Sequence, residues 1–369
     1  MAVSRINEAG LNVNQYGNRN LIINGAMQVA QRGTARTVSD GGAEGYQTLD
    51  RFSFNYANSA GGVATISQDT TVPSGYGFSK SYKVDIATAD TSIATDHMIY
   101  ISQKVEAQNI RNSGWDYTNT SSYITLSFWA RSVKAGIYNV VFRADDVGAK
   151  YYPVEYTLVA DTWKKITITV PGDSSLVFND DTGSGLDIRW NLQLGTARDN
   201  GTANQWNATD AGNAGTSNQV NFFDHIDNNF FLTGVQLEVG ETATDFEHRS
   251  YGDELARCQR YFYSHTSGTA SAVMPGTGTS YASDFLVLSV QFPVQMRGTP
   301  TMTESTGTNY VRYFHTNSSL NFNGFGNMQE ASVIGVNVYN DGVSGLTAGN
   351  VGWCRAVDAS YKLGFDAEL

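Results

Sequence analysis

The chain has 369 residues, enough for two ordinary domains, and 41% of them are hydrophobic, which excludes a wholly disordered protein. The net charge of −11 and the lack of a Lys/Arg cluster exclude a general nucleic-acid binder and disfavour binding to an anionic membrane surface. Residues 1–20 are polar and no run of 18 apolar residues occurs, so we expect neither a signal peptide nor membrane insertion. Charged residues make up only 16% and glycine and aromatic residues are frequent, which favours short strands, tight turns and large loops.

The N-terminal part of the chain is polar and lacks a regular pattern. Residues 1–45 are predicted to form an extended arm, with one short apolar anchor at residues 21–23. Residues 32–45 mix glycine, serine, threonine and aspartate, which is typical of a loop. Such an arm is suited to docking onto other proteins of a larger particle and to becoming ordered when it binds them.

Residues 46–249 carry a repeated strand pattern. Polar and apolar side chains alternate over residues 51–56, 82–86, 123–131, 138–144, 163–170, 188–194 and 230–239. In residues 188–194, the clearest case, the apolar side chains are expected in the core, with Arg189, Asn191 and Gln193 on the other face. Many short strands with no helices between them predict an antiparallel jelly-roll β-sandwich. Two long loops, 109–122 and 195–220, are of a length that is usually functional or mobile.

One helix is predicted between two strand-rich regions. Apolar side chains recur at helical spacing from Asp253 to Tyr263, and Ser250 stands three residues before Asp253, as in a capping box. Residues 250–263 are therefore expected to form a connector helix. Strand patterns return over residues 284–291, 330–339 and 361–369, so residues 264–369 are predicted to form a smaller C-terminal β-sandwich.

Residues that enzymes use for catalysis are scattered along the chain. The five histidines show no metal-ligand spacing, and no nucleophile elbow, phosphate-binding loop or dinucleotide motif occurs. We expect no enzymatic activity and no cofactor, although a polysaccharide hydrolase with one hidden carboxylate pair stays open. Cys258 and Cys354 have neither metal-ligand nor redox spacing and are predicted to be buried free thiols.

Two acidic stretches offer hard oxygen ligands for a structural Ca²⁺. One combines residues 179–181 with Asp187, and the other is Asp145–Asp146. Neither has the spacing of an EF-hand loop. The alternative interpretation is that these carboxylates are solvated and shape turns, so no metal ligand is assigned.

The face of the first domain that points away from the core is the candidate binding surface, on the assumption that its strands lie in one sheet. An aromatic plane beside amides and guanidinium groups suits sugars, because rings stack on the apolar sugar face while polar groups bind its hydroxyls. The alternatives are a solvated outer face or contact with the arm or a partner subunit, and, for the loop aromatics, loop anchoring. The candidate glycan-binding residues are Trp129, Arg131, Arg143, Arg189, Asn191 and Gln193, with Trp115, Tyr117 and Trp206 on the two long loops.

Two long stretches carry a family resemblance. Residues 20–33, NLIINGAMQVAQRG, are followed by the pattern of Tyr46, Asp50, Arg51 and Phe52. Residues 232–240, LTGVQLEVG, run on to residues 246–261, FEHRSYGDELARCQRY. Both stretches resemble conserved motifs of bacteriophage tail-fibre and tail-appendage proteins, and they bracket about 240 residues. Residues 123–131 and 162–165 are similar to strands of carbohydrate-binding-module jelly rolls, and residues 364–369 resemble the usual ending of such phage proteins.

The resemblance implies a virion component at the phage tail, commonly a homotrimer, assembled in the host cytoplasm. Together with the candidate binding surface it favours attachment to a host-surface glycan, and it carries no catalytic residues over to this chain. The chain lacks the repeats of a long fibre shaft, which favours a short distal or adaptor piece. A purely structural virion protein that touches only other tail proteins, and a polysaccharide depolymerase, are the alternatives.

Overall fold

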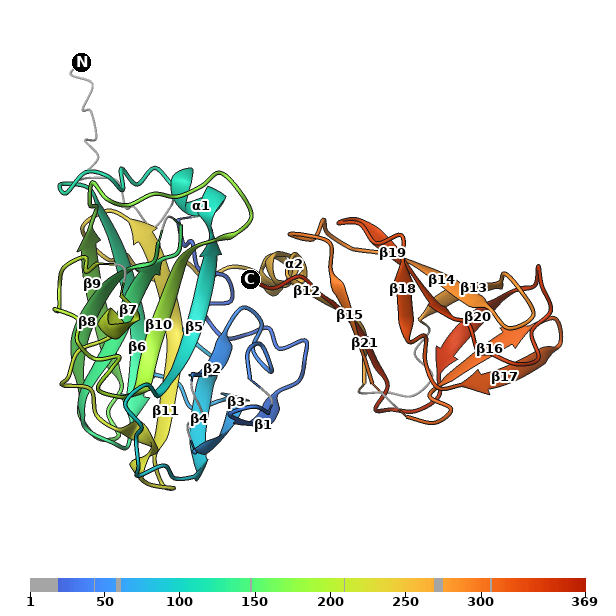
Figure 1. The fold of residues 1–369 in the computed structure, drawn as a ribbon, viewed down its shortest axis with the longest axis horizontal. Helices are drawn as coiled ribbons and strands as arrows, with labels where there is room; N and C mark the ends of the chain where they lie inside the picture. Colours follow the sequence, from blue (N-terminus) through green and yellow to red (C-terminus); the bar gives the residue numbers. More distant parts are fainter. Residues whose placement is uncertain are drawn as a thin grey trace, which may run out of the picture. The chain divides into compact units, whose positions relative to one another are not determined.

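The computed structural model describes residues 19–42, 44–57, 61–146, 148–208, 210–268, 275–305 and 307–369. The chain divides into two compact units, Met1–Tyr251 and Gly252–Leu369. Antiparallel strands build both units, as Figure 1 shows, and the predicted all-β class with two β-sandwiches is confirmed. Residues 1–18 of the predicted arm lie outside the described residues.

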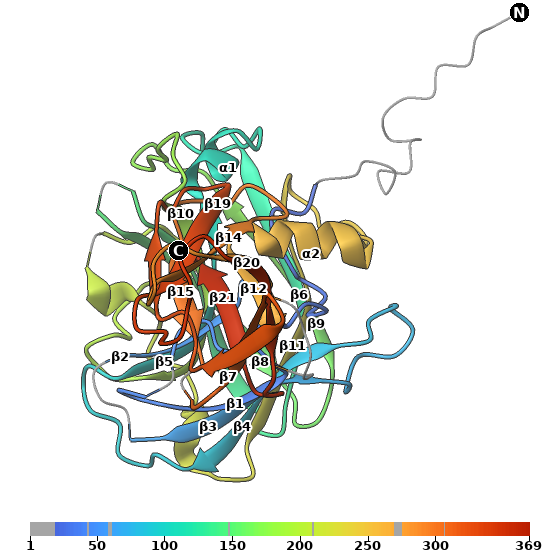
Figure 2. The ribbon, with the colours of Figure 1, turned by 90° about the vertical axis from the view of Figure 1, so that its right-hand side faces the viewer.

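The first unit is a jelly-roll sandwich of two sheets whose hydrogen-bonded neighbours are antiparallel. The six-stranded sheet consists, in spatial order, of β1 (Ala35–Ser39), β3 (Val63–Asp69), β4 (Ser81–Thr88), β11 (Asn229–Val239), β6 (Tyr123–Ser132) and β9 (Lys164–Pro171). The five-stranded sheet consists of β2 (Ser53–Ala57), β5 (Met98–Glu106), β10 (Ser184–Leu194), β7 (Gly136–Ala144) and β8 (Lys150–Leu158). Figure 2 shows β1, β3 and β4 as neighbouring strands.

The core of the first unit lies between the two sheets and is rich in aromatic rings. Phe128 of β6 and Trp190 of β10 meet edge to face, with ring centroids 5.8 Å apart, and neither is exposed. The alternation seen in the sequence explains this, because every second side chain of a strand faces the partner sheet. Full burial of one such side chain contributes roughly 1.5–3 kcal/mol, so these rings are a main source of stability.

The N-terminal motif belongs to this core rather than to a separate arm. Ile22 is completely buried, and the backbone of Ile23 exchanges two hydrogen bonds with the side chain of Gln103 on β5 (3.1 and 2.8 Å). The expectation of a loop across residues 32–45 is wrong for β1, which pairs with β3. The alternation is faint there, because β1 is an edge strand in which Val38 alone is buried.

Helices are short and few among the described residues. α1 (Ala107–Arg111) and the 3₁₀ turns η3 (Ala211–Asn213) and η4 (Phe222–Asp224) were not expected, since elements of this length leave no periodic signal. The expected helix is α2 (Tyr251–Gln259), which begins directly after Ser250. Its predicted end at residue 263 is wrong, because Phe262 already opens strand β12 (Phe262–Ser267). No helix among the described residues is long and apolar enough to cross a membrane.

The second unit is a smaller β-sandwich. Its three-stranded sheet consists of β12, β21 (Lys362–Asp366) and β15 (Thr301–Glu304). Its seven-stranded sheet consists, in spatial order, of β17 (Ser318–Phe322), β16 (Val311–His315), β20 (Val351–Ala356), β13 (Gly276–Ser280), β14 (Leu286–Gln291), β19 (Gly335–Asn340) and β18 (Asn327–Gln329). Leu288 and Tyr313 of the larger sheet and Phe365 of the smaller one are completely buried in a common core.

Candidate functional site

The predicted glycan-binding residues do not share one surface. Trp129 and Arg131 lie on β6 of the six-stranded sheet, whereas Arg143 and Arg189 lie on β7 and β10 of the five-stranded sheet. The assumption that all these strands belong to one sheet is therefore wrong. Their outward positions are on opposite sides of the sandwich, and the two sides are distinct candidate surfaces.

On the six-stranded side, Trp129 packs against a neighbouring ring. The centroid of Tyr76, a residue that is 52% exposed, lies 4.3 Å from that of Trp129. Arg131 pairs with Asp161 (2.8 Å), and its guanidinium carbon lies 5.3 Å from the ring centroid of Phe231. Arg131 thus already has an anionic and an aromatic partner within the chain.

The aromatic residues of the two long loops anchor those loops. Trp115 is buried, contacts Phe178 and donates its indole N–H to the carbonyl of Ser122 (3.3 Å). Tyr117 meets the same Phe178 ring edge to face, at a centroid distance of 5.0 Å. Trp206 is half-buried and donates to the carbonyl of Pro171 (2.9 Å). Their contacts fit the loop-anchoring alternative better than an open sugar platform.

Loop 195–220 covers one end of the outer face of the five-stranded sheet. Asn191 is completely buried there and donates its side-chain N–H to the carbonyl of Ala214 (2.8 Å). Asn139 accepts hydrogen bonds from both the backbone and the hydroxyl of Thr216 (3.2 and 3.0 Å). Gln193 is equally buried and donates to Asp90 (3.2 Å). Asn191 and Asn139 therefore hold the loop on the sheet, and a ligand would have to displace it to reach Asn191.

The other end of this outer face combines charged and aromatic side chains, and we call it the Arg189 site: Tyr100 and Lys104 of β5, Asp187 and Arg189 of β10, Arg143 of β7 and Tyr151 of β8. Strand register places Lys104, Asp187, Arg143 and Tyr151 side by side in one row across four strands. Unlike the covered amides, Tyr100, Lys104 and Arg143 are partly exposed.

Arg189 is the centre of the Arg189 site. Its Nε donates to Asp187 Oδ2 (2.7 Å), and its guanidinium carbon lies 4.7 Å from the ring centroid of Tyr100. Arg143 is ion-paired with Asp145 and donates to the hydroxyl of Tyr151 (3.3 Å). These contacts fix two guanidinium groups in direction, so a ligand that binds them loses little further side-chain entropy.

Burial sets the charge states at the Arg189 site. Burial, and then the nearby Asp187 carboxylate, raise the pKa of Asp145. Burial by itself lowers the pKa of Arg189, but Asp187 and Tyr100 act more strongly together, so its net pKa is raised and it stays charged. Burial also raises the pKa of Tyr100, whose hydroxyl therefore remains a hydrogen-bond donor. The result is an array of fixed donors beside an aromatic ring.

Asp187 carries an acceptor that the protein does not use. This carboxylate is 1% exposed, and its Oδ1 has no hydrogen-bond partner among the described residues. Leaving such an atom unpaired costs on the order of 1–3 kcal/mol.

The acidic stretches considered for Ca²⁺ serve turns and ion pairs instead. Asp146 accepts from the backbone and side chain of Asn179 (2.9 and 2.8 Å), and Asp181 accepts from the backbone of Gly183 (2.8 Å). Asp187 is committed to Arg189. Across the described ranges, no group of three or more His, Cys, Asp or Glu side chains is placed to hold a metal ion.

Sequence reasoning missed several residues of the Arg189 site. Tyr100 and Lys104 lie on β5, where residues 98–106 alternate weakly because the pairing with β10 contains a register shift. Tyr151 lies on β8, in which Pro153 interrupts the apolar pattern. The alternation of Tyr100, Ser102 and Lys104 was the available signal, and it would have placed all three on the outer face.

The fold and site define a two-unit β-sandwich protein whose jelly-roll unit carries a partly open polar and aromatic face. No protein-family model matches the chain, and no curated protein matches it. Among solved structures it is similar to the enzymatically active domain of tailspike protein 4 of bacteriophage CBA120 (11% identity, TM-score 0.32, 60% of this chain and 22% of that one). It is also similar to a CBM4 module, with 17% identity and a TM-score of 0.29 over 59% of this chain and 98% of that one. A third similar structure is the family 11 carbohydrate-binding module from Clostridium thermocellum in complex with a mixed-linked tetrasaccharide. It has 11% identity and a TM-score of 0.29, over 57% of this chain and 98% of that one.

The chain spans about a fifth of the tailspike structure that it matches. At these identities and TM-scores no binding or catalytic property passes from these proteins to this chain.

Proposed function

We propose that this protein is a bacteriophage tail-appendage component whose first unit binds a host-surface glycan at the Arg189 site without catalysing a reaction. Glycan binding is inferred from the Arg189 site itself, where Asp187 holds Arg189 over the ring of Tyr100. The phage half is supported by the two motifs at residues 20–33 and 232–261.

The chemistry of the Arg189 site suits a sugar. The Tyr100 ring offers an apolar surface for the C–H face of a pyranose, and Arg143 and Lys104 offer donors to its hydroxyls. Donors and acceptors in one fixed array distinguish one arrangement of hydroxyls from another, which is the basis of specificity.

A single open site of this kind binds weakly, so oligomerisation would matter. A closed homotrimer presents three copies at once, and the combined attachment exceeds that of one site without any new contact. The N-terminal residues would connect the protein to other tail proteins in the virion.

Binding of the purified protein to host cells and to a glycan array tests the proposal. Tyr100→Ala and Arg143→Gln should each weaken binding about tenfold or more, since each removes a contact worth roughly 1.4 kcal/mol. Arg131→Gln is the matched control, because it removes the same charge from the opposite sheet. A wild-type protein that binds no host surface and no glycan would overturn the glycan half and leave the structural virion role.

The role of Arg189 is tested with a double variant that also changes Asp187. Replacing it alone leaves the buried Asp187 charge without its partner, which by itself costs on the order of 3–5 kcal/mol. Asp187→Asn combined with Arg189→Gln removes both charges and keeps similar volumes. This double variant should fold and lose glycan binding.

A depolymerase is the second candidate, because burial, and then the neighbouring Asp187 carboxylate, raise the pKa of Asp145. A general acid requires such a raised pKa. Incubation of the protein with host polysaccharide, followed by measurement of new reducing ends, tests for this hydrolytic activity. Release that Asp145→Asn abolishes would establish catalysis and overturn the non-catalytic proposal.

A further inference from the structure

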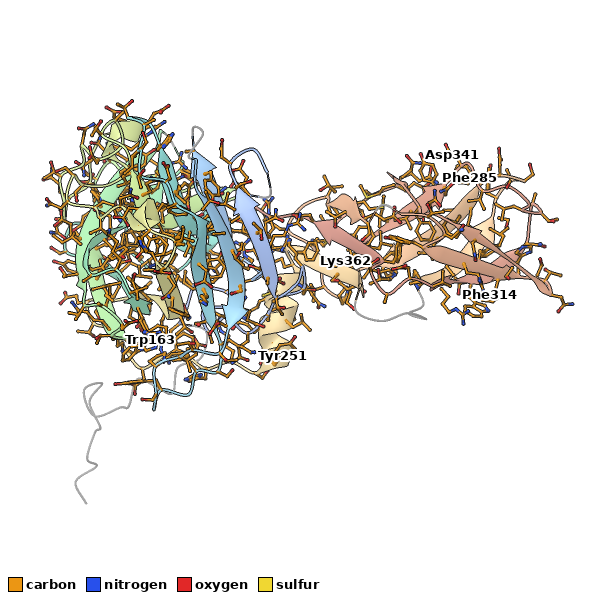
Figure 3. All side chains as sticks on the ribbon, turned by 90° about the horizontal axis from the view of Figure 1, so that it is seen from below. Trp163, Tyr251, Phe285, Phe314, Asp341 and Lys362 are labelled. Carbon is orange, nitrogen blue, oxygen red and sulfur yellow. The ribbon has the colours of Figure 1, made fainter. Side chains whose placement is uncertain are left out.

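A second surface with binding chemistry lies on the outer face of the second unit. β16 and β20 are adjacent antiparallel strands, and their register pairs Arg312 with Arg355 and Phe314 with Trp353. We call these four residues the Arg355 patch. Figure 3 shows Phe314 on a different edge of the second unit from Phe285 and Asp341.

The aromatic half of the patch is a stacked pair that reaches solvent. The rings of Phe314 and Trp353 are nearly parallel, at 11°, with centroids 4.1 Å apart. Trp353 is 41% exposed and its strand neighbour Val351 is 62% exposed. Large apolar side chains exposed together on a sheet face mark interaction sites more often than isolated ones do.

The cationic half of the patch consists of Arg312 and Arg355. The guanidinium of Arg355 lies over Phe314 (4.9 Å) and Trp353 (5.8 Å), and that of Arg312 lies 5.9 Å from the Phe314 centroid. Arg312 donates to the amide oxygen of Asn321 (2.7 Å). In the described part of the chain no carboxylate forms an ion pair with either arginine, and Arg355 Nε is buried without a hydrogen-bond partner.

This arrangement is unfavourable for the protein alone. Like charges directly opposite each other on adjacent strands repel, and the repulsion is stronger where aromatic rings exclude water. The whole chain carries a net charge of −11, yet its many carboxylates, where the structure describes them, are not used to neutralise this pair. An external anion that binds between the two arginines would therefore relieve their repulsion.

An open depression beside the patch adds polar side chains. It has a volume of about 510 Å³ and is lined by Phe314, Trp353 and Val351 together with His315, Ser318, Ser319 and Asn317. The turn at its rim is a two-residue hairpin in which Thr316 and Asn317 both have positive φ (27° and 59°). A branched residue such as threonine is strained there, and strain of this kind concentrates at functional sites.

We propose that the Arg355 patch binds an acidic saccharide, a glycan whose sugar rings carry carboxylate groups. Trp353 and Phe314 offer the apolar surface on which a sugar ring stacks, while Arg312 and Arg355 bind its carboxylate. The hydroxyls and amides around the depression bind its hydroxyl groups. A neutral sugar would leave the two guanidiniums unneutralised, so the patch selects for the anion.

Calorimetric titration of the full chain with oligosaccharides of uronic acids, and with neutral oligosaccharides of equal length, tests the proposal. The acidic ligands should bind with an affinity that falls as salt is added, and the neutral ones should bind at least tenfold more weakly. Arg312→Gln and Arg355→Gln should each weaken binding about tenfold, and Trp353→Ala should abolish it. Lys362→Gln removes one positive charge elsewhere on the same unit, and Tyr281→Ala removes a ring that is 78% exposed; both should bind like wild type.

Four results would overturn the proposal. The first three are equal affinity for neutral and acidic ligands, unchanged binding in the folded Arg355→Gln and Trp353→Ala variants, and no binding to any acidic oligosaccharide. Inorganic phosphate that competes at the same concentration as the oligosaccharide would reduce the patch to a simple anion site and also overturn it. The inference goes beyond the first unit's proposed role, and Tyr100→Ala, tested in parallel, separates the two: it should leave acidic-saccharide binding at the Arg355 patch intact.

Discussion

Asn20 and Leu237 are 217 residues apart in the chain and are joined by a buried hydrogen bond, from the Leu237 backbone N–H to Asn20 Oδ1 (3.0 Å). The same oxygen accepts from the backbone of Ile22 (2.9 Å), and Asn20 Nδ2 donates to the carbonyl of Val235 (3.1 Å). Asn20 opens one of the two motifs on which the phage resemblance depends, and Leu237 lies in the other. The two motifs therefore build one interface inside the first unit, and their role there is structural.

Asn20→Ala should destabilise the first unit. The change leaves two buried backbone N–H groups and one carbonyl without their partner, which costs roughly 2–4 kcal/mol in the free energy of unfolding. Urea unfolding followed by tryptophan fluorescence measures the effect. Asn119→Ala, at an exposed turn where the amide bonds Asp116 and Ser121, should cost less than about 1 kcal/mol. Equal losses in the two variants would contradict the structural role of Asn20.

Trp206→Ala should reduce stability and leave glycan affinity unchanged. The indole packs edge to face on Tyr152, with centroids 5.3 Å apart, and its N–H bonds the carbonyl of Pro171. Loss of a half-buried ring of this size costs about 1–3 kcal/mol. Thermal unfolding and a glycan-binding titration of the same variant separate the two effects. Lost affinity in a protein that melts like wild type would instead make Trp206 a ligand contact.

The two cysteines should be inert in the folded protein. Neither forms a disulfide and both are completely buried, as the sequence predicted, and burial raises the pKa of the Cys354 thiol to about 12. A thiol reagent such as DTNB reacts with the thiolate, so at pH 8 neither residue should react until the chain is unfolded. In guanidinium chloride, two thiols per chain should react. Rapid reaction of the native protein would show that one of these sites opens locally.

The second unit should lose stability in mild acid because of His265. Burial lowers the pKa of this imidazole below its ordinary 6.5, although its hydrogen bond to the carbonyl of Pro275 acts in the opposite direction. Below pH 6.5 the unfolded chain binds a proton that the folded chain resists, so the contribution of His265 is complete above that pH. It is lost as the pH falls toward the lowered value, by up to about 1.4 kcal/mol per pH unit.

Hydrogen exchange of the β12 amides, compared at pH 7.5 and pH 5.5 after correction for intrinsic rates, tests this expectation. His265→Gln is the control, because glutamine occupies a similar position without titrating. Protection that does not change with pH in the wild type would contradict the lowered pKa. A pH effect that persists in His265→Gln would assign it to another group.

The sequence by itself determined the local features of this protein. A period of two in residues 123–131, 138–144 and 188–194 is visible because every second side chain of a strand is buried, and the structure confirms that Phe128, Phe142 and Trp190 face the core. It also determined the all-β class and the start of the helix after Ser250, since alternation and capping depend on neighbouring residues.

Only the tertiary structure decided which strands share a sheet. Alternation shows which way a side chain points from its own strand, but not which strand lies beside it. The sequence pattern is therefore compatible with Trp129 and Arg189 on one face, whereas their strands belong to different sheets. Alternation likewise does not show that loop 195–220 covers Asn191, or that Arg312 lies beside Arg355, which is 43 residues further along the chain. Contacts between distant residues depend on how sheets pair and loops fold back, and those are properties of the whole chain.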